Sequence, residues 1–203
     1  MTTFDDYSGK YETVRMERKD GILQITLHTN GESLQWGEVP HRELPNAFRD
    51  IGSDPENRVV SMAGTGDAFT GPPGTRQTRH QRGPRQWDKT YWEGKHLLMN
   101  LLDIEVPMIA AVNGPALRHS ELALLCDIVL ASNEAAFQDS GHFINGLIPG
   151  DGMHVIYPML LGLNRGRYFL LTGQIIPAQE ALTLGLVNEV MPEGDLLPRA
   201  WTL

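Results

Sequence analysis

The stretch Phe137-Gln-Asp-Ser-Gly-His-Phe-Ile-Asn-Gly-Leu-Ile-Pro-Gly-Asp-Gly152 decides the fold of this chain, together with two segments that precede it. Those segments are Gly64-Thr-Gly-Asp-Ala-Phe69 and Asn113-Gly-Pro-Ala-Leu-Arg-His-Ser-Glu-Leu-Ala-Leu-Leu-Cys-Asp127. The last of the three carries His142 and Asp151, an imidazole and a carboxylate in one loop. Side chains of these two types move protons near neutral pH, so the loop is the first candidate for a site.

The residues around these segments alternate between strand-like and helix-like patterns. Val14–Lys19 and Gly21–His28 alternate apolar and polar residues on either side of Asp20-Gly21, which is a strong hairpin signal. Three short apolar runs are expected to form buried strands: Arg58–Ala63, Pro107–Val112 and Asp127–Ala131. Two further stretches are expected to be helical: Trp87–Leu102 and Pro177–Leu184. Strands that alternate with helices predict an α/β architecture.

In their order and spacing, the three segments resemble the enoyl-CoA hydratase/isomerase (crotonase) superfamily. The resemblance runs from about residue 11 to residue 203, and its most specific motifs are Pro149–Gly152, Asn164–Gly173 and Ala181–Val190. It implies a single domain, residues 1–203, built as a spiral of stacked ββα turns. It also implies further helices beyond Leu203, so the C-terminal helical region is expected to be truncated. By analogy, the protein is expected to form a homotrimer or a dimer of trimers.

The composition of the 203 residues narrows the class of protein. With 41% hydrophobic and 21% charged residues, the chain is expected to be globular. The net charge of −8 argues against nucleic-acid partners, because a phosphate backbone would repel it. The single cysteine, Cys126, permits no internal disulfide. No signal peptide or apolar stretch of ~20 residues is visible, so we expect a cytoplasmic protein with no membrane partner.

Residues 71–86 interrupt every periodic pattern, because glycine and proline open a basic, polar stretch. We predict an exposed, mobile loop at this position. Its four arginines could hold the phosphates of coenzyme A, or they could form a solvated surface: Arg76, Arg79, Arg82 and Arg85.

His142 is the main catalytic candidate. The resemblance puts it where many hydratases have a catalytic glutamate, and Asp151 could accept a hydrogen bond from one of its ring nitrogens. The other nitrogen would then take a proton from water, as an imidazole with a pKa of ~6.5 can do at neutral pH. The alternative is that His142 is a loop histidine and that Asp151 caps the following helix.

The resemblance also implies an altered oxyanion site. His119 and Arg118 replace glycines in a stretch whose N–H groups normally stabilise an enolate. Pro73 stands where a backbone N–H donor is expected, and proline has none. Since losing such a donor costs ~10²–10³ in rate, side-chain donors are needed, and His119 and the indole N–H of Trp36 are the candidates. For Trp36 the alternative is a purely packing aromatic.

Three further residues are predicted to bind substrate: His41, Glu121 and Phe69. His41 follows Trp36 by five residues, in a segment that resembles the early active-site loop of the β-diketone hydrolases, the subgroup that includes 6-oxocamphor hydrolase. A surface histidine is the alternative for His41. The resemblance aligns Glu121 with a second catalytic glutamate of hydratases. The alternative is that Glu121 orients the helix behind His119.

The metal-binding motifs Cys-x-x-Cys and His-Glu-x-x-His are absent, and so is a phosphate loop. The serine-nucleophile motif Gly-x-Ser-x-Gly is absent as well. We therefore expect no cofactor. The leading hypothesis is a hydrolase that cleaves a carbon–carbon bond in cyclic or bicyclic β-diketones by a retro-Claisen reaction to give keto acids. The alternatives are an acyl-CoA hydratase or isomerase that uses Glu121, and a non-catalytic member of the superfamily.

Overall fold

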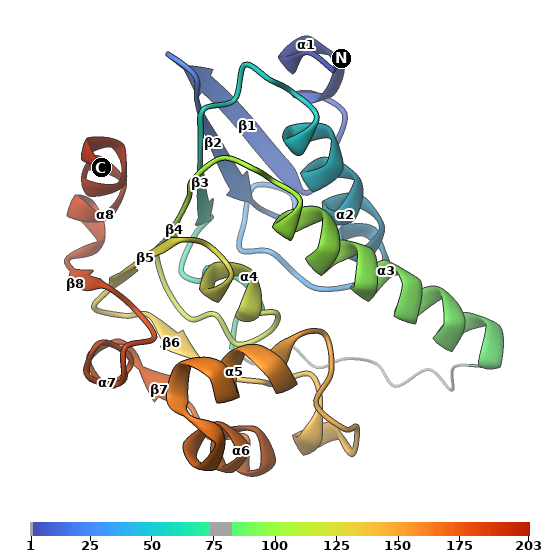
Figure 1. Cartoon of the computed structure of the whole chain (residues 1–203), viewed down its shortest axis with the longest axis vertical. Coiled ribbons are helices and arrows are strands. Elements are labelled where there is room, and N and C mark those ends of the chain that lie inside the picture. Colours follow the sequence, from blue (N-terminus) through green and yellow to red (C-terminus); the bar gives the residue numbers. More distant parts are fainter. Residues whose placement is uncertain (1, 74–82) are drawn as a thin grey trace.

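The computed structural model describes residues 2–73 and 83–203 (Figure 1). Its strands are β1 (Val14–Lys19), β2 (Ile22–Leu27), β3 (Val59–Gly64), β4 (Met108–Val112), β5 (Ile128–Ser132), β6 (Ala136–Phe137), β7 (Ile176–Pro177) and β8 (Glu189–Met191). Its helices are α1 (Phe4–Tyr7), α2 (Glu38–Gly52), α3 (Pro84–Leu102), α4 (Glu121–Leu124), the 3₁₀ turn η1 (Phe143–Asn145), α5 (Met153–Leu161), α6 (Leu163–Thr172), α7 (Ala178–Leu184) and α8 (Glu193–Thr202).

A six-stranded sheet in the order β1-β2-β3-β4-β5-β8 forms the centre of the fold. Only the β1–β2 pair is antiparallel, and it is the predicted hairpin. Its turn residues Asp20 and Gly21 have φ angles of 53° and 81°, as a tight two-residue hairpin turn requires. The remaining pairs are parallel, so the loops that follow β3, β4 and β5 all leave from the same edge of the sheet.

The predicted stacked turns are confirmed. Each of β3, β4 and β5 is followed by a short extended segment, and these segments pair with one another in parallel through the bridges Thr70–Ala116 and Ala116–Phe137. Each turn of the spiral thus supplies one strand to the sheet and one residue or short strand to a second, smaller ladder. The ladder brings Thr70, Ala116 and Phe137 together, although they are far apart in the sequence.

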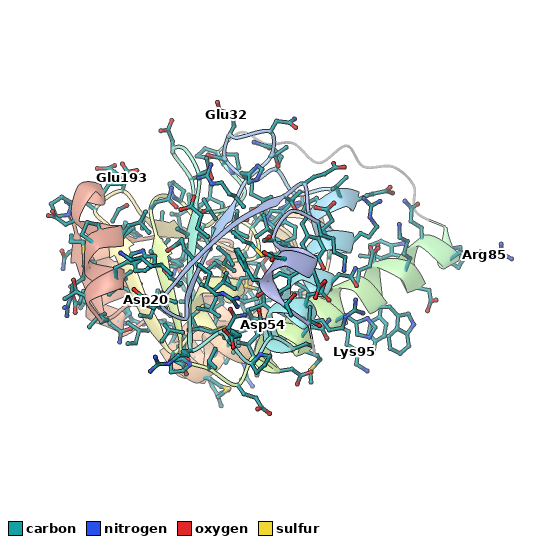
Figure 2. All side chains as sticks on the ribbon, turned by 90° about the horizontal axis from the view of Figure 1, so that it is seen from above. Asp20, Glu32, Asp54, Arg85, Lys95 and Glu193 are labelled. Carbon is teal, nitrogen blue, oxygen red and sulfur yellow. The ribbon has the colours of Figure 1, made fainter. Side chains whose placement is uncertain are left out.

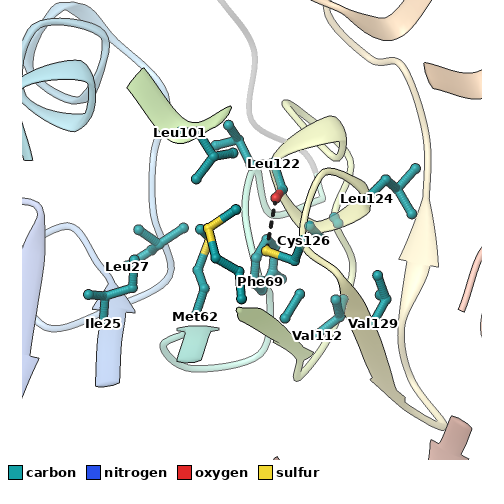
Figure 3. Close-up of a cluster of buried hydrophobic side chains, with 14 of the residues drawn as sticks. Ile25, Leu27, Met62, Phe69, Leu101, Val112, Leu122, Leu124, Cys126 and Val129 are labelled. Carbon is teal, nitrogen blue, oxygen red and sulfur yellow. Dashed lines mark hydrogen bonds between the residues drawn. The ribbon is translucent and has the colours of Figure 1, made fainter. Parts of the chain in front are cut away.

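Helices cover the sheet on both sides, as Figure 1 shows. α2 and α3 pack against each other over one face, while α8 packs on β4 and β5. The core between sheet and helices contains Phe69, Met62 and Leu122 (Figure 3), and the Cys126 thiol in it donates to the Leu122 carbonyl. Burial raises the pKa of that thiol to about 12, so Cys126 is a core residue.

Charged side chains such as Glu32, Arg85 and Glu193 project from the periphery (Figure 2). Arg85 stands at the start of α3, because the helix begins at Pro84 and not after residue 86 as the sequence suggested. Proline is favoured in the first turn of a helix, since it has no N–H to lose. The other predicted loop arginines, Arg76, Arg79 and Arg82, lie outside the described residues. None of the helices in the described ranges has both the length and the apolar character of a membrane-spanning segment.

Candidate functional site

A cavity of about 280 Å³ lies between α3, the segment that enters α4, and the loop that precedes α5. Its polar lining comes from His41, Thr90, Arg118, His119, Glu121, His142 and Asp151. Its apolar lining comes from Trp87, Tyr91, Leu147, Ile148 and Met153. The cavity therefore combines an apolar wall with a cluster of titratable groups, which is the usual character of a small-molecule site.

The smaller ladder explains why His142 and His119 share this cavity. The Gln138 N–H donates to the Ala116 carbonyl at 3.3 Å, and the Ser140 N–H donates to the Leu117 carbonyl at 2.9 Å. These bonds continue the pairing of the second ladder beyond Phe137. They carry the loop that holds His142 alongside the segment that holds His119.

His142 lies between two carboxylates. Its Nδ1 is 2.8 Å from Asp139 Oδ1, and its Nε2 is 3.4 Å from Asp151 Oδ2. The Asp139 side chain is only 1% exposed, whereas that of Asp151 is 34% exposed. The first contact is a well-formed buried hydrogen bond, and the second is an ion-pair distance that is long for a hydrogen bond.

Burial by itself lowers the pKa of His142, but the hydrogen bonds and charges of Asp139 and Asp151 outweigh it and raise the pKa to about 10. For Asp151, burial raises the pKa, while His142 and the nearby His119 and His41 lower it to about 2. The resting site therefore holds an imidazolium between two carboxylates. The sequence-based expectation of a histidine with an ordinary pKa is wrong for this state.

His119 forms the second carboxylate–histidine pair. Its Nδ1 is 2.6 Å from Glu121 Oε1, and both side chains are buried. Burial raises the pKa of Glu121, although His119 acts in the opposite direction. Glu121 Oε2 is buried and has no hydrogen-bond partner among the described residues. Since Nδ1 of His119 is used by Glu121, Nε2 is the nitrogen that can meet a ligand in the cavity.

Trp36 and His41 pack against His119, with ring centroids 3.9 Å and 5.1 Å from its imidazole. The indole N–H of Trp36, however, donates to Thr70 Oγ1. Trp36 therefore supports His119 through its ring, and its predicted role as an oxyanion donor would require it to leave Thr70. His41 lines the cavity, and its contact with substrate stays a prediction.

Two of the site residues have left-handed backbone conformations, His119 with φ 52° and Asp151 with φ 45°. Glycine adopts this conformation readily, whereas other residues do so at a cost that is common at functional sites. The helix that follows Asp151 has Gly152 as its N-cap. The capping role that the sequence allowed for Asp151 is therefore wrong, and its carboxylate contacts His142 instead.

The structure corrects one predicted residue and adds another. Phe69 is fully buried in the hydrophobic core, so it has no surface left for a substrate, and the prediction of substrate contact is wrong. Asp139 was not singled out from the sequence, although it lies three residues before His142. An acidic residue at that spacing in a loop is a weak signal, because nothing in the sequence reveals its burial. Within residues 2–73 and 83–203, no group of three or more potential ligands is arranged to hold a metal ion.

Comparison with known proteins identifies related chains. The family model described as enoyl-CoA hydratase/isomerase matches residues 17–203. A probable peroxisomal enoyl-CoA hydratase from Arabidopsis thaliana is 33% identical over 182 residues, which are 89% of this chain and 66% of that protein. The chain thus spans just under two thirds of the length of this relative.

Two solved structures are similar along most of the chain. One is a β-diketone hydrolase from the cyanobacterium Anabaena bound to (S)-3-oxocyclohexyl acetic acid, at 50% identity and a TM-score of 0.91, covering 97% of this chain and 79% of that one. The other is an enoyl-CoA hydratase from Bacillus anthracis, at 27% identity and a TM-score of 0.83, covering 94% of this chain and 74% of that one.

The charge on His142 predicts a pH dependence of stability. Its folded-state pKa of about 10 exceeds the ordinary 6.5, so its stabilising contribution is complete below pH 6.5 and is lost as the pH rises through 10. We expect His142→Asn, which keeps a donor for Asp139, to lose this dependence. Unfolding by urea should show that the free energy of unfolding falls between pH 6 and pH 9, and that this fall is on the order of a few kcal/mol larger in wild type than in the variant. Equal losses would contradict the charge assignment.

Proposed function

The chain belongs to the enoyl-CoA hydratase/isomerase family, and we propose that within it the chain is a hydrolase that cleaves a carbon–carbon bond of a cyclic or bicyclic β-diketone. The observation that carries this proposal is the pair of carboxylate–histidine contacts on one cavity, Asp139–His142 and Glu121–His119. They offer a proton acceptor and a separate donor for a negatively charged oxygen. Water addition to a ketone needs both.

In the proposed reaction, His142 acts at Nε2, the nitrogen beside Asp151. The fraction of His142 that has lost its Nε2 proton accepts a proton from water as the water oxygen attacks one ring carbonyl. Burial raises the pKa of Glu121, so in the proposed reaction its protonated carboxyl group donates to His119 Nδ1. The proton of the neutral His119 ring then lies on Nε2, which donates to the oxygen on which negative charge develops. Because the pKa of His142 is raised, the reactive fraction grows with pH.

The tetrahedral adduct then collapses. The bond between the attacked carbon and the carbon that lies between the two carbonyls breaks, and its electron pair is delocalised onto the second carbonyl as an enolate. The attacked carbon becomes a carboxylic acid. The proton held on His142 returns to the enolate carbon, so water is the only co-reactant and the product is a keto acid.

The cavity suits a small ring better than an extended chain. Trp87 and Tyr91 of α3 and Met153 of α5 supply apolar contacts at its wall, and its volume of about 280 Å³ is of the size that a bicyclic diketone requires. A diketone carries its own electron sink in the second carbonyl. The proposed reaction therefore requires no coenzyme A.

The β-diketone hydrolase from Anabaena supports this choice, because half of its aligned residues are identical to those of this chain. The compound bound to it, (S)-3-oxocyclohexyl acetic acid, contains one ketone and one carboxylate. These are the groups that remain when water opens a bicyclic octanedione whose carbonyls flank one bridgehead. We carry the same class of substrate to this chain as a proposal, together with the homotrimer or dimer of trimers that the family resemblance implies and the cytoplasmic location expected from the sequence.

Asp151 is held in place by a close approach of α3. A Cβ atom at Gly94 would lie 2.7 Å from Asp151 Oδ1, which is nearer than a side-chain carbon can come. Gly94 is therefore the residue that allows the carboxylate to lie against the helix beside His142 Nε2. Alanine at this position would force Asp151 to move.

A second candidate function is hydration or isomerisation of an acyl-CoA. Glu121 favours it, since it lines the cavity, and an enoyl-CoA hydratase is among the similar proteins. Against it, Glu121 Oε1 is hydrogen-bonded to His119 Nδ1, so this carboxyl oxygen is already engaged. His142 also replaces the second carboxylate of a two-glutamate mechanism.

Replacement of His142 tests the proposed function directly. With a panel of cyclic and bicyclic 1,3-diketones, we expect wild type to release keto acid, detected by chromatography and mass spectrometry. His142→Asn should lower kcat by ~10²–10⁴, the usual contribution of a general base. His154→Asn on the exposed face of α5 is the matched control and should keep wild-type turnover. Undiminished turnover in His142→Asn would sink the mechanism, and turnover of any diketone would rule out a non-catalytic role.

Substitution of Gly94 tests the role of Asp151 without changing a polar group. Gly94→Ala should remain folded, because alanine is the better helix former, and should lose up to ~10² in kcat. Gly52→Ala in α2 is the control, since its Cβ would meet nothing nearer than 3.5 Å. If both variants retain full turnover, the position of Asp151 is irrelevant to the reaction.

Coenzyme A separates the two candidate functions. We expect calorimetric titration of the folded protein with coenzyme A and with a short acyl-CoA to show no binding at micromolar concentrations, because the proposed reaction uses a substrate without a nucleotide. Tight binding, accompanied by hydration of an enoyl-CoA that disappears in Glu121→Gln, would favour the second candidate.

A further inference from the structure

Asp139 is a buried acidic residue that does not line the cavity itself but contacts His142, which does. Its Oδ1 accepts from His142 Nδ1 at 2.8 Å and from the Gly141 N–H at 3.2 Å. Its Oδ2 is buried and has no hydrogen-bond partner among the described residues. A carboxylate in this position is costly unless a positive partner faces it, and the only cation within reach in the described contacts is His142.

The backbone on both sides of this contact is fixed. Asp139 lies between Gln138 and Ser140, whose N–H groups both donate to the neighbouring segment of the ladder. The His142 carbonyl accepts from the N–H groups of Asn145 and Leu147, at 2.8 Å and 3.2 Å. The backbone of both partners is therefore held in place, which favours a preorganised contact.

The two carboxylates beside His142 differ in what they can do. Asp151 is partly exposed, borders the cavity and lies at the longer distance, so a ligand or water can compete for it. Asp139 is shielded from solvent, so its charge acts on His142 with little screening. The other charged or titratable groups that line the same cavity are His41, Tyr91, Arg118, His119 and Glu121.

We propose that Asp139 is the positioning residue of this site, which keeps a proton on His142 Nδ1 and directs Nε2 into the cavity. The residue that the sequence suggested for this task, Asp151, is then left to contact water or substrate. The assignment rests on the proposed function only for its effect on catalysis. The contact itself is a property of the folded chain and can be measured without turnover.

The direct test is a pH titration of His142 by ¹⁵N NMR, with His142→Asn used to identify the signal. In wild type we expect both ring nitrogens to remain protonated well above pH 7 and Nδ1 to keep its proton when Nε2 loses it. Asp139→Asn preserves the shape and an oxygen that can accept from Nδ1 but removes the charge. We expect the titration midpoint to fall by more than one pH unit in this variant.

Asp54→Asn is the matched control, because Asp54 is also a buried carboxylate, bonded to Tyr7 and Arg18 away from the cavity. It should reduce stability and leave the midpoint of His142 unchanged. An unchanged midpoint in Asp139→Asn would overturn the proposal. So would a wild-type His142 that titrates near pH 6.5, a result that needs no variant to fold.

Kinetics connect the assignment to the reaction. With a diketone substrate, the rise of kcat/KM with pH should shift to lower pH in Asp139→Asn, together with a lower plateau, and Asp54→Asn should leave both unchanged. A shift of the NMR midpoint in a protein that hydrolyses no diketone would uphold the positioning role and reject the proposed function. Hydrolysis of a diketone together with an unshifted midpoint would uphold the proposed function and reject the positioning role.

Discussion

The hydrogen bond from His142 to buried Asp139 is the interaction on which the account of this site depends. It fixes which ring nitrogen of His142 faces the cavity, and it stabilises the positive charge on His142 that Asp151 contacts at Nε2. Two turns of the spiral pair their extended segments, so that the loop after β6 runs beside the segment before α4. This pairing holds the backbone on both sides of Asp139, although the contact with His142 is itself local.

The same scaffold carries a second histidine in an unusual setting. His119 has a left-handed backbone at a position where glycine would be relaxed, and its ring lies between Trp36 and a buried glutamate. Strain of this kind is maintained only when the surroundings hold the residue firmly. The family resemblance implies backbone N–H groups for oxyanion binding, and under the proposed function the His119 side chain takes that task. Fold membership alone therefore does not identify the reaction.

Much of the architecture could be predicted from local signals. Asp20-Gly21 marks a hairpin because two consecutive positive φ angles suit this dipeptide, and the glycine turns after the apolar runs mark the stacked turns. The meeting of His142 and Asp151 could be predicted from the loop that holds both. Family motifs supplied the remainder of the topology.

What the sequence did not reveal depends on contacts between distant segments. The burial of Asp139 follows from pairing across the ladder, and so does the use of the Trp36 N–H by Thr70, 34 residues away. Phe69 adjoins the turn that the family resemblance links to oxyanion binding, yet its ring packs into the core, which its neighbours in sequence do not reveal. A pKa raised to about 10 likewise requires Asp139 as well as Asp151, and no sequence pattern reveals that Asp139 is buried beside His142.

The measurement that tests the central claim most directly is the fate of labelled water. Wild-type protein would be incubated with a bicyclic 1,3-diketone in H₂¹⁸O, and the products analysed by mass spectrometry against a control that corrects for exchange of ketone oxygens. We expect one enzyme-dependent ¹⁸O atom in the carboxylate of a ring-opened keto acid. An intact ring after incubation with folded protein, or a product that carries the label only in a hydroxyl group, would contradict carbon–carbon hydrolysis.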